Sequence, residues 1–168
     1  MDEQDDGPDA RAPDPGDLVR ICEALNRNGA RYVLIGGYAM ILHGAGRATM
    51  DIDFLVDDDP ANVARVKMAL AVLADNAAAE VADDDVRAYT VVRVADEVIV
   101  DLLGKACDVD YADAIRDAES HDLGDVPVRL ASKPTLIRTK RTWRDRDAAD
   151  RRWLEDRIAD ETAEKPER

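Results

Sequence analysis

The residues of this sequence best placed for chemistry are three carboxylates inside apolar runs. Asp51 and Asp53 alternate with apolar residues in DIDFLV, and Asp101 interrupts the apolar run EVIVDLLG. Because successive side chains of a strand point to opposite faces, Asp51 and Asp53 share one face. Neighbouring carboxylates repel unless a cation lies between them, and a buried Asp101 needs a cation, a basic partner or a place at the sheet edge. Given the pair, we interpret Asp101 as the third ligand of a metal site.

A strand, a glycine turn and a short helix precede the first two carboxylates. The apolar run YVLI at residues 32–35 is bounded by Gly36 and Gly37, which is typical of a buried strand that ends in a tight turn. Residues 39–43 are long enough for one or two helical turns. The loop that follows carries two polar residues: Arg47 and Thr49.

Two common ligand-binding motifs do not fit this stretch. An EF-hand loop starting at Asp51 needs Gly and Glu at its sixth and twelfth positions, where the sequence has Val56 and Asn62. A dinucleotide-binding fingerprint needs Gly-x-Gly-x-x-Gly after the first strand, and the sequence lacks it. A solvated Asp-x-Asp loop and a plain Gly-Gly turn remain alternatives for either motif alone, whereas their combination favours a functional site.

This combination resembles the nucleotidyltransferases of the DNA polymerase β superfamily. Their pattern is a Gly-Gly or Gly-Ser turn, a short helix, Asp-x-Asp on the next strand and a third acid on a later strand. The sequence GGYAMILHG-x-x-R-x-T-x-DIDFLV is most similar to the AbiEii-type bacterial toxins. Thr49 stands where that branch more often has Ser, so a hydroxyl is kept. The resemblance covers roughly residues 29–154.

The C-terminal segment LIRTKRTWRDRDAADRRWL also resembles the AbiEii-type branch. In that branch a lysine on one helix precedes Arg-x-Lys-Asp-x-x-Asp on the next. The matching residues here are Lys140, Arg144, Arg146, Asp147 and Asp150. Arg146 replaces the usual Lys, which keeps the charge but changes the hydrogen-bond geometry. The alternative is a solvated helix with i,i+4 ion pairs such as Asp147–Arg151.

The resemblance implies a metal-dependent transferase with an NTP, such as ATP, as donor. Two Mg²⁺ ions, or Mn²⁺ in their place, activate the acceptor oxygen and hold the leaving pyrophosphate in such enzymes. The expected metal ligands are Asp51, Asp53 and Asp101, which with Lys140 form the expected catalytic set. The residues expected to bind the nucleotide are Gly36, Gly37, Arg47, Thr49 and Lys140.

The resemblance leaves the acceptor open. Our first expectation is RNA, such as tRNA, or protein in a toxin–antitoxin or abortive-infection setting, with a cognate antitoxin as a partner. One alternative is an aminoglycoside or lincosamide nucleotidyltransferase, although the Arg-x-x-His-x-Asp-x-Asp approach common in that group is absent. Another is a non-catalytic antitoxin or interaction module on the same fold. A lost carboxylate would signal such a module, and all three are present.

Composition limits the partners. The formal net charge of −14 argues against a protein that coats nucleic acid through its whole surface. A basic run nevertheless occurs late in the chain, and we expect it to line the active-site cleft: Lys133, Arg138, Lys140, Arg141, Arg144 and Arg146. No apolar run approaches 18 residues, so we expect no membrane partner and a cytoplasmic location. Cys22 and Cys107 form no metal pattern and are expected to be free thiols.

The predicted fold is α/β, a small mixed β-sheet flanked by helices like the polymerase β palm, with a C-terminal helical segment. We expect a disordered acidic tail at residues 1–16, a nucleotidyltransferase domain at 17–160 and a frayed end at 161–168. Asp17 and Pro60 are expected to begin helices. Beyond them we predict a hairpin of residues 86–94 and 98–103, a helix at 110–119, a strand at 126–130 and a helix capped by Ser132. A last helix is expected at 145–158, with Ala149, Trp153 and Ile158 on its packed side.

Overall fold

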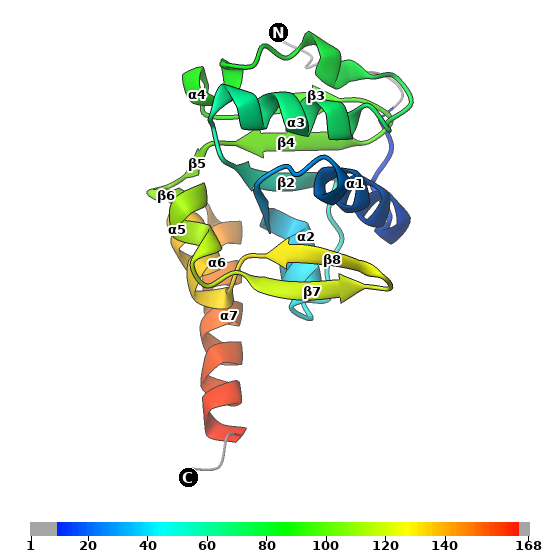
Figure 1. Ribbon diagram of the computed structural model, residues 1–168. Coiled ribbons are helices and arrows are strands. Elements are labelled where there is room, and N and C mark those ends of the chain that lie inside the picture. Colours follow the sequence, from blue (N-terminus) through cyan, green and yellow to red (C-terminus); the bar gives the residue numbers. More distant parts are fainter. Residues whose placement is uncertain (1–9, 165–168) are drawn as a thin grey trace, which may run out of the picture.

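The computed structural model describes residues 10–164 and places a mixed sheet between two layers of helices (Figure 1). The strand order is β3-β4-β2-β1-β8-β7. These strands are β1 Tyr32–Ile35, β2 Asp51–Val56, β3 Val92–Ala95, β4 Ile99–Leu103, β7 Glu119–Leu123 and β8 Val126–Leu130. A separate small ribbon pairs β5 Lys105–Ala106 with β6 Val109–Asp110.

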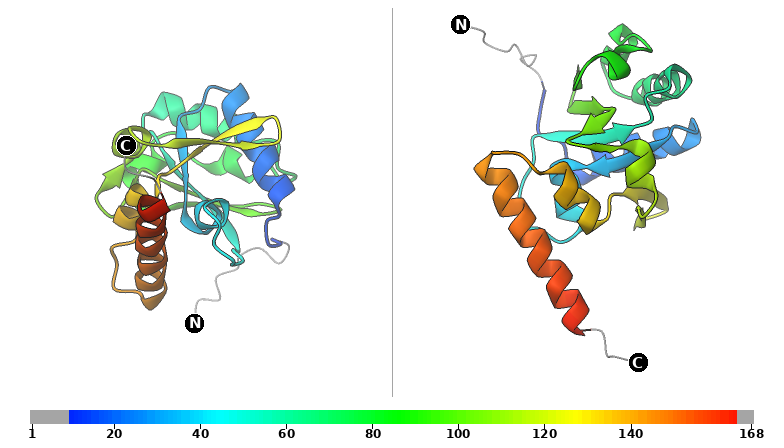
Figure 2. Two further views of the ribbon diagram at one scale, coloured as in Figure 1. Left: turned by 90° about the horizontal axis from the view of Figure 1, so that it is seen from below. Right: turned by 90° about the vertical axis from the view of Figure 1, so that its left-hand side faces the viewer.

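Helices cover both faces of this sheet. They are α1 Pro15–Arg27, α2 Gly36–Leu42, α3 Pro60–Leu70, α4 Asp85–Ala88, α5 Tyr111–Ile115, α6 Lys133–Thr139 and α7 Asp145–Glu164, with a 3-10 turn η1 at Ala77–Glu80. The pair α1 and α3 lies on one side of the sheet, and α2, α6 and α7 lie on the other (Figures 1 and 2). The C-terminal part of α7 extends beyond the rest of the fold (Figure 2). The predicted α/β architecture with a C-terminal helical segment is therefore confirmed.

The core between the sheet and the pair α1 and α3 follows from simple periodicities. Ile52, Phe54 and Val56 alternate along β2 and are buried, as the period of a strand requires. On α3 the buried stripe is Val63, Val66 and Leu70, which repeats at the spacing of a helix. This apolar face fixes the register of β2, and it therefore commits Asp51 and Asp53 to the opposite face.

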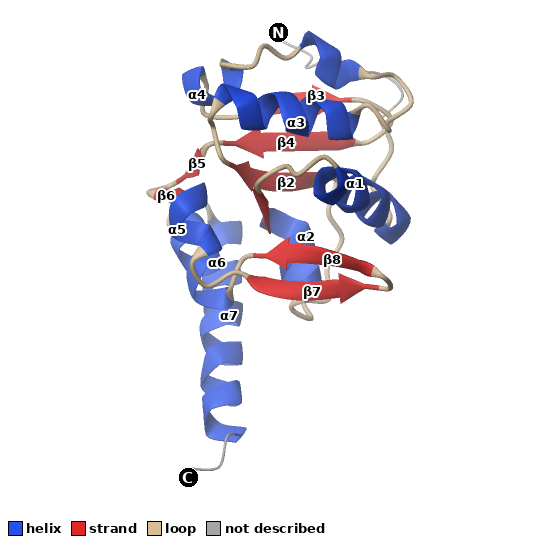
Figure 3. Ribbon diagram, viewed as in Figure 1, coloured by secondary structure: helices blue, strands red, loops and turns tan. Residues whose placement is uncertain are grey.

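The sheet mixes parallel and antiparallel pairs, as Figure 3 shows. Strand β2 pairs antiparallel with β1 and parallel with β4. In the parallel pair Asp53 lies opposite Asp101. Strand β3 pairs antiparallel with β4 and lies at the edge of the sheet. Neighbouring strands thus bring residues about fifty positions apart to one face.

The N-terminal helix begins earlier than predicted. Asp14, not Asp17, is the N-cap of α1, and Asp17 is the N3 residue of a capping box. Arg11 pairs with Asp17 at 2.6 Å, and its backbone N–H bonds the Glu97 carbonyl. Residues 10–16, predicted as part of a disordered tail, are thus tied to the fold, while the remainder of that prediction, residues 1–9, lies outside the described residues.

Two middle elements also differ from expectation. The predicted hairpin forms, but its first strand covers only Val92–Ala95, and Val86 belongs to α4. The predicted helix at residues 110–119 ends at Ile115, because Glu119–Leu123 pairs with β8 as strand β7. Gly124, with φ of +63°, therefore lies in the turn of a hairpin. Pairing with β8 at the edge of the sheet outweighed the local preference of residues 119–123 for a helix.

The last helix packs only partly through the predicted face. Of the residues expected on its packed side, Ala149 is exposed, whereas Trp153 and Ile158 are half-buried and Trp153 contacts the core. The fully buried residues are Asp147, Asp150 and Leu154, so α7 is docked through ion pairs as well as through apolar contacts. The helix also continues to Glu164, past the predicted start of fraying at 161, and residues 165–168 lie outside the described part.

Across residues 10–164, none of the helices combines the length and apolar character that a membrane crossing requires. Cys22 is buried and Cys107 is exposed, and both are free thiols as predicted.

Candidate active site

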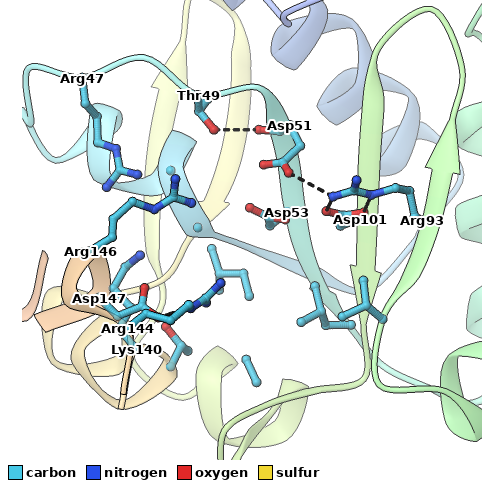
Figure 4. Close-up of a pocket in the computed structure, with 17 residues that line it drawn as sticks. Arg47, Thr49, Asp51, Asp53, Arg93, Asp101, Lys140, Arg144, Arg146 and Asp147 are labelled. Carbon is cyan, nitrogen blue, oxygen red and sulfur yellow. Dashed lines mark hydrogen bonds and ion pairs between the residues drawn. The ribbon is translucent and has the colours of Figure 1, made fainter. Parts of the chain in front are cut away.

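The three predicted carboxylates meet in one pocket. Asp51 and Asp53 come from β2 and Asp101 from the neighbouring β4, and one oxygen of each lies within 4.8 Å of the others. Figure 4 shows the three side chains directed into the same space. The strand pattern predicted the shared face of the first two, and the parallel pairing of β2 and β4 adds the third.

Electrostatics in this cluster disfavour three negative charges. Burial raises the pKa of the Asp53 carboxyl to about 8, and the charges of Asp51 and Asp101 act in the same direction, against a smaller opposing effect of Lys140. Burial and then Asp101 also raise the pKa of Asp51, while Arg93 and Arg146 oppose the rise. A cation among these oxygens would remove that cost.

The donor set fits a divalent hard cation. It consists of carboxylate oxygens alone, which are the ligands that Mg²⁺ and Mn²⁺ prefer. Asp51 and Asp53 are half-buried, and Asp101 is buried, so the cluster keeps one open side towards the pocket for other ligands.

The two glycines allow α2 to begin against this cluster. Gly36 has φ of +73°, and a Cβ there would lie 2.1 Å from Oδ2 of Asp53. A Cβ on Gly37 would lie 2.6 Å from Oγ1 of Thr49. Any larger residue would therefore collide with the pocket wall. The glycines serve close packing against the carboxylate strand in addition to the turn that the sequence predicted.

The opposite wall of the pocket is basic and is organised by Asp150 of α7. Asp150 accepts hydrogen bonds from Arg47 at 2.7 Å and from Lys140 at 3.0 Å. Lys140 is 7% exposed, and Asp150 supplies the opposite charge that a buried cation needs. Arg151 donates to the Lys140 carbonyl, which replaces the Asp147–Arg151 ion pair of the solvated-helix alternative. The C-terminal motif thus supplies Lys140 and the carboxylate that holds it, and Arg47 reaches the same carboxylate from the loop before β2.

Two further arginines line the pocket from the start of α7 and the loop before it. Arg144 pairs with Asp147 at 2.9 Å, and Asp147 also accepts from the Thr142 hydroxyl. Arg146 is exposed and points towards the carboxylates (Figure 4). The pocket between the acidic and basic walls has a volume of about 270 Å³.

Thr49 lies at the pocket as predicted, but its hydroxyl is engaged within the protein. It donates to the backbone carbonyl of Asp51 at 3.1 Å. This bond fixes the approach of the loop to β2, and the hydroxyl oxygen can still accept a hydrogen bond from a ligand.

The predicted basic run does not form one continuous wall. Lys140, Arg144 and Arg146 line the pocket, whereas Arg141 is exposed outside its lining. The other two members are directed elsewhere: Lys133 pairs with Glu161 at 2.8 Å, and Arg138 with Asp108 at 3.9 Å. The run spans two helices and a loop, so its members point in different directions.

Among the charged residues that line the described pocket, Arg93 was not predicted from the sequence. Arg93 of β3 lies opposite Asp101 in the antiparallel pair with β4. Its Nε and one terminal nitrogen bond both Asp101 oxygens, at 3.0 and 3.1 Å, and the same terminal nitrogen lies 3.4 Å from Asp51. The sequence did contain a signal for this contact: Arg93 in VVRVA and Asp101 lie on the two strands of the predicted hairpin. The hairpin centre lies one residue later than predicted, which hid the register.

Comparison with known proteins agrees with this geometry. Residues 20–102 match the family described as "Nucleotidyl transferase AbiEii toxin, Type IV TA system". A comparison with curated proteins finds no match. The matched segment runs from within α1 to β4 and contains the glycine turn and all three carboxylates, whereas Lys140 and α7 lie beyond it. Over these residues the sequence matches the AbiEii nucleotidyltransferase family model, which confirms the resemblance predicted from its motifs.

Proposed function

We propose that this protein is a metal-dependent nucleotidyltransferase that moves a nucleoside monophosphate from an NTP to an acceptor and releases pyrophosphate. The observation that carries the proposal is the opposition of three carboxylates, within 4.8 Å of one another, to four basic side chains across one pocket. Nucleotidyl transfer needs charge neutralisation and in-line positioning more than covalent help. An acidic wall for cations and a basic wall for phosphates meet that need.

The residues divide into two groups by role. Asp51, Asp53 and Asp101 would hold Mg²⁺, which would supply charge neutralisation and lower the pKa of the acceptor oxygen. Lys140 and Arg47, held by Asp150, face the phosphates of the NTP and counter their charge.

The space beside the glycines accepts part of the nucleotide. Gly36 and Gly37 line the pocket without side chains, so phosphate oxygens can approach the backbone at this point. Thr49 lies beside Gly37 and offers its oxygen to the ligand.

The acceptor we propose is RNA or protein, in a toxin–antitoxin setting with a cognate antitoxin as partner. Support comes from the toxin family that residues 20–102 match and from the exposed arginines at the pocket. Arg141, Arg144 and Arg146 are exposed in a chain with net charge −14, and such a local basic surface steers a polyanion to one place.

Transfer of label tests the proposed activity. Purified protein is incubated with each labelled NTP, Mg²⁺ and, in turn, total RNA, a protein lysate or a panel of aminoglycosides and lincosamides. We expect label on RNA or protein, and a loss of at least ~10³-fold, about 4 kcal/mol of barrier, in Asp53→Ala. Label on an antibiotic would correct the acceptor, whereas undiminished transfer by Asp53→Ala would overturn the assigned site.

Asp101→Asn separates catalysis from folding at the third position. The amide keeps the shape of the side chain but weakens its binding of a cation, so transfer should be abolished while the protein remains folded. A variant that is destabilised yet fully active would make Asp101 a structural partner of Arg93 and remove it from the metal site.

A further inference from the structure

Arg93 occupies the carboxylate oxygens that a cation in this pocket would use. Its guanidinium bonds both oxygens of Asp101, at 3.0 and 3.1 Å, and lies 3.4 Å from Oδ2 of Asp51. A planar guanidinium matches a carboxylate with two parallel hydrogen bonds, which makes this pair stronger than a single-point contact. Two of the three candidate ligands are thus already neutralised by a side chain of the protein.

The surroundings of Arg93 allow it to leave. It lies on β3, the edge strand of the sheet, and its side chain is 42% exposed, whereas the side chain of Asp101 is 7% exposed. The carboxylates are therefore fixed in the sheet, and the arginine is the member of the pair that can swing into water. Its backbone position opposite Asp101 also lets it return without any change in the fold.

We propose that Arg93 is an internal competitor of the metal, because its guanidinium must leave Asp101 and Asp51 before both carboxylates can bind a divalent cation. This inference rests on the metal site of the proposed function. Arg93 balances the carboxylates in the metal-free protein and weakens cation binding relative to what the carboxylates alone would give. Occupancy of the site is then set by the competition between an intramolecular cation and a free one.

Binding of Mn²⁺ alone to the full chain, measured by isothermal titration calorimetry, tests the competition. Arg93→Gln should bind Mn²⁺ at least ~10-fold more tightly than wild type, equivalent to about 1.4 kcal/mol. Arg146→Gln is the matched control, because it removes the same charge from the same pocket and also acts on Asp51 through space. It should tighten binding by less than ~3-fold. An Arg93→Gln affinity equal to that of wild type or of the control overturns the proposal.

A second variant and a second readout distinguish competition from a purely structural role. Arg93→Lys keeps the charge but loses the two-point contact, so it should bind Mn²⁺ ~3-fold more tightly than wild type; if Arg93→Gln does not fold, an unchanged Arg93→Lys affinity overturns the proposal. Arg93→Gln should melt at a lower temperature without metal, and saturating Mn²⁺ should erase the difference. An equal deficit with and without Mn²⁺ contradicts the competition.

Asp53→Ala separates this inference from the proposed function. Mn²⁺ binding by wild type but not by Asp53→Ala supports the metal site, and the Arg93 variants then decide the competition alone. If neither wild type nor either Arg93 variant binds Mn²⁺, the metal site of the proposed function fails and the inference fails with it.

Discussion

Asp53→Asn should stabilise the metal-free protein, and the gain should grow with pH. The ionised Asp53 lies among two other carboxylates, and its burial raises its pKa from 3.8 to about 8. Folding therefore favours the protonated form. The stability that comes from this proton is complete below about pH 4 and is lost as the pH rises through about 8.

The size of the gain follows from that rise. A change from 3.8 to about 8 corresponds to roughly 5–6 kcal/mol against the ionised form, at about 1.4 kcal/mol per pKa unit. The pKa of Asp51 is raised as well, so the cost of ionisation is shared between these two neighbours and removing one charge should recover about half, ~2–3 kcal/mol at pH 9. For a chain of this size that amounts to ~5–10 °C in melting temperature. At pH 5 the two proteins should differ little.

Thermal melts with a metal chelator, from pH 5 to pH 9, measure this effect. Asp122→Asn, which removes an exposed carboxylate on β7, is the control for the general effect of lowering the negative charge. Adding Mg²⁺ at pH 9 should narrow or reverse the advantage of Asp53→Asn, because only wild type keeps all three carboxylates. A gain that is independent of pH, or equal to that of the control, would refute the electrostatic account of the cluster.

Three other predictions concern the walls of the pocket. Asp150→Asn should lower the free energy of unfolding by about 2–4 kcal/mol, because Lys140 loses its buried partner. Urea denaturation measures this loss, with Asp156→Asn at an exposed position of the same helix as the control. A loss below ~0.5 kcal/mol contradicts the prediction. Gly36→Ala should abolish transfer, since its Cβ meets Asp53, whereas Gly29→Ala has a similar φ of +66° with open space around it and should lose only ~1–2 kcal/mol of stability. If RNA is the acceptor, the double variant Arg144→Glu and Arg146→Glu should weaken RNA binding and flatten its salt dependence, by about 0.7 in slope per lost phosphate contact. Arg152→Glu, at an exposed position of α7 outside the pocket lining, should have little effect. RNA binding by wild type that does not depend on salt would favour a protein acceptor.

The sequence by itself determined that two of the three carboxylates share one face. Strand alternation places Asp51 and Asp53 on one face, and the buried side chains Ile52, Phe54 and Val56 leave no other register. The helix start at Pro60 and the cap at Ser132 were also predicted, because a helix start depends on a few neighbouring residues. These features are set within one element, so periodicity and residue type were sufficient to predict them.

The contacts of the basic wall, and the contact of Arg93 with the carboxylates, depended on the tertiary structure. Asp150 joins Arg47, which lies 103 positions away in the sequence, and Arg93 meets Asp101 only because the hairpin centre lies one residue later than local turn preferences suggested. The packed face of α7 was only partly predicted, because Asp147 and Asp150 are buried in it beside the apolar Leu154. Hydrophobic periodicity does not encode which distant charge a side chain will meet. That choice is made when sheet order and helix docking bring the partners together, because a charge withdrawn from water is stable only beside a matching one.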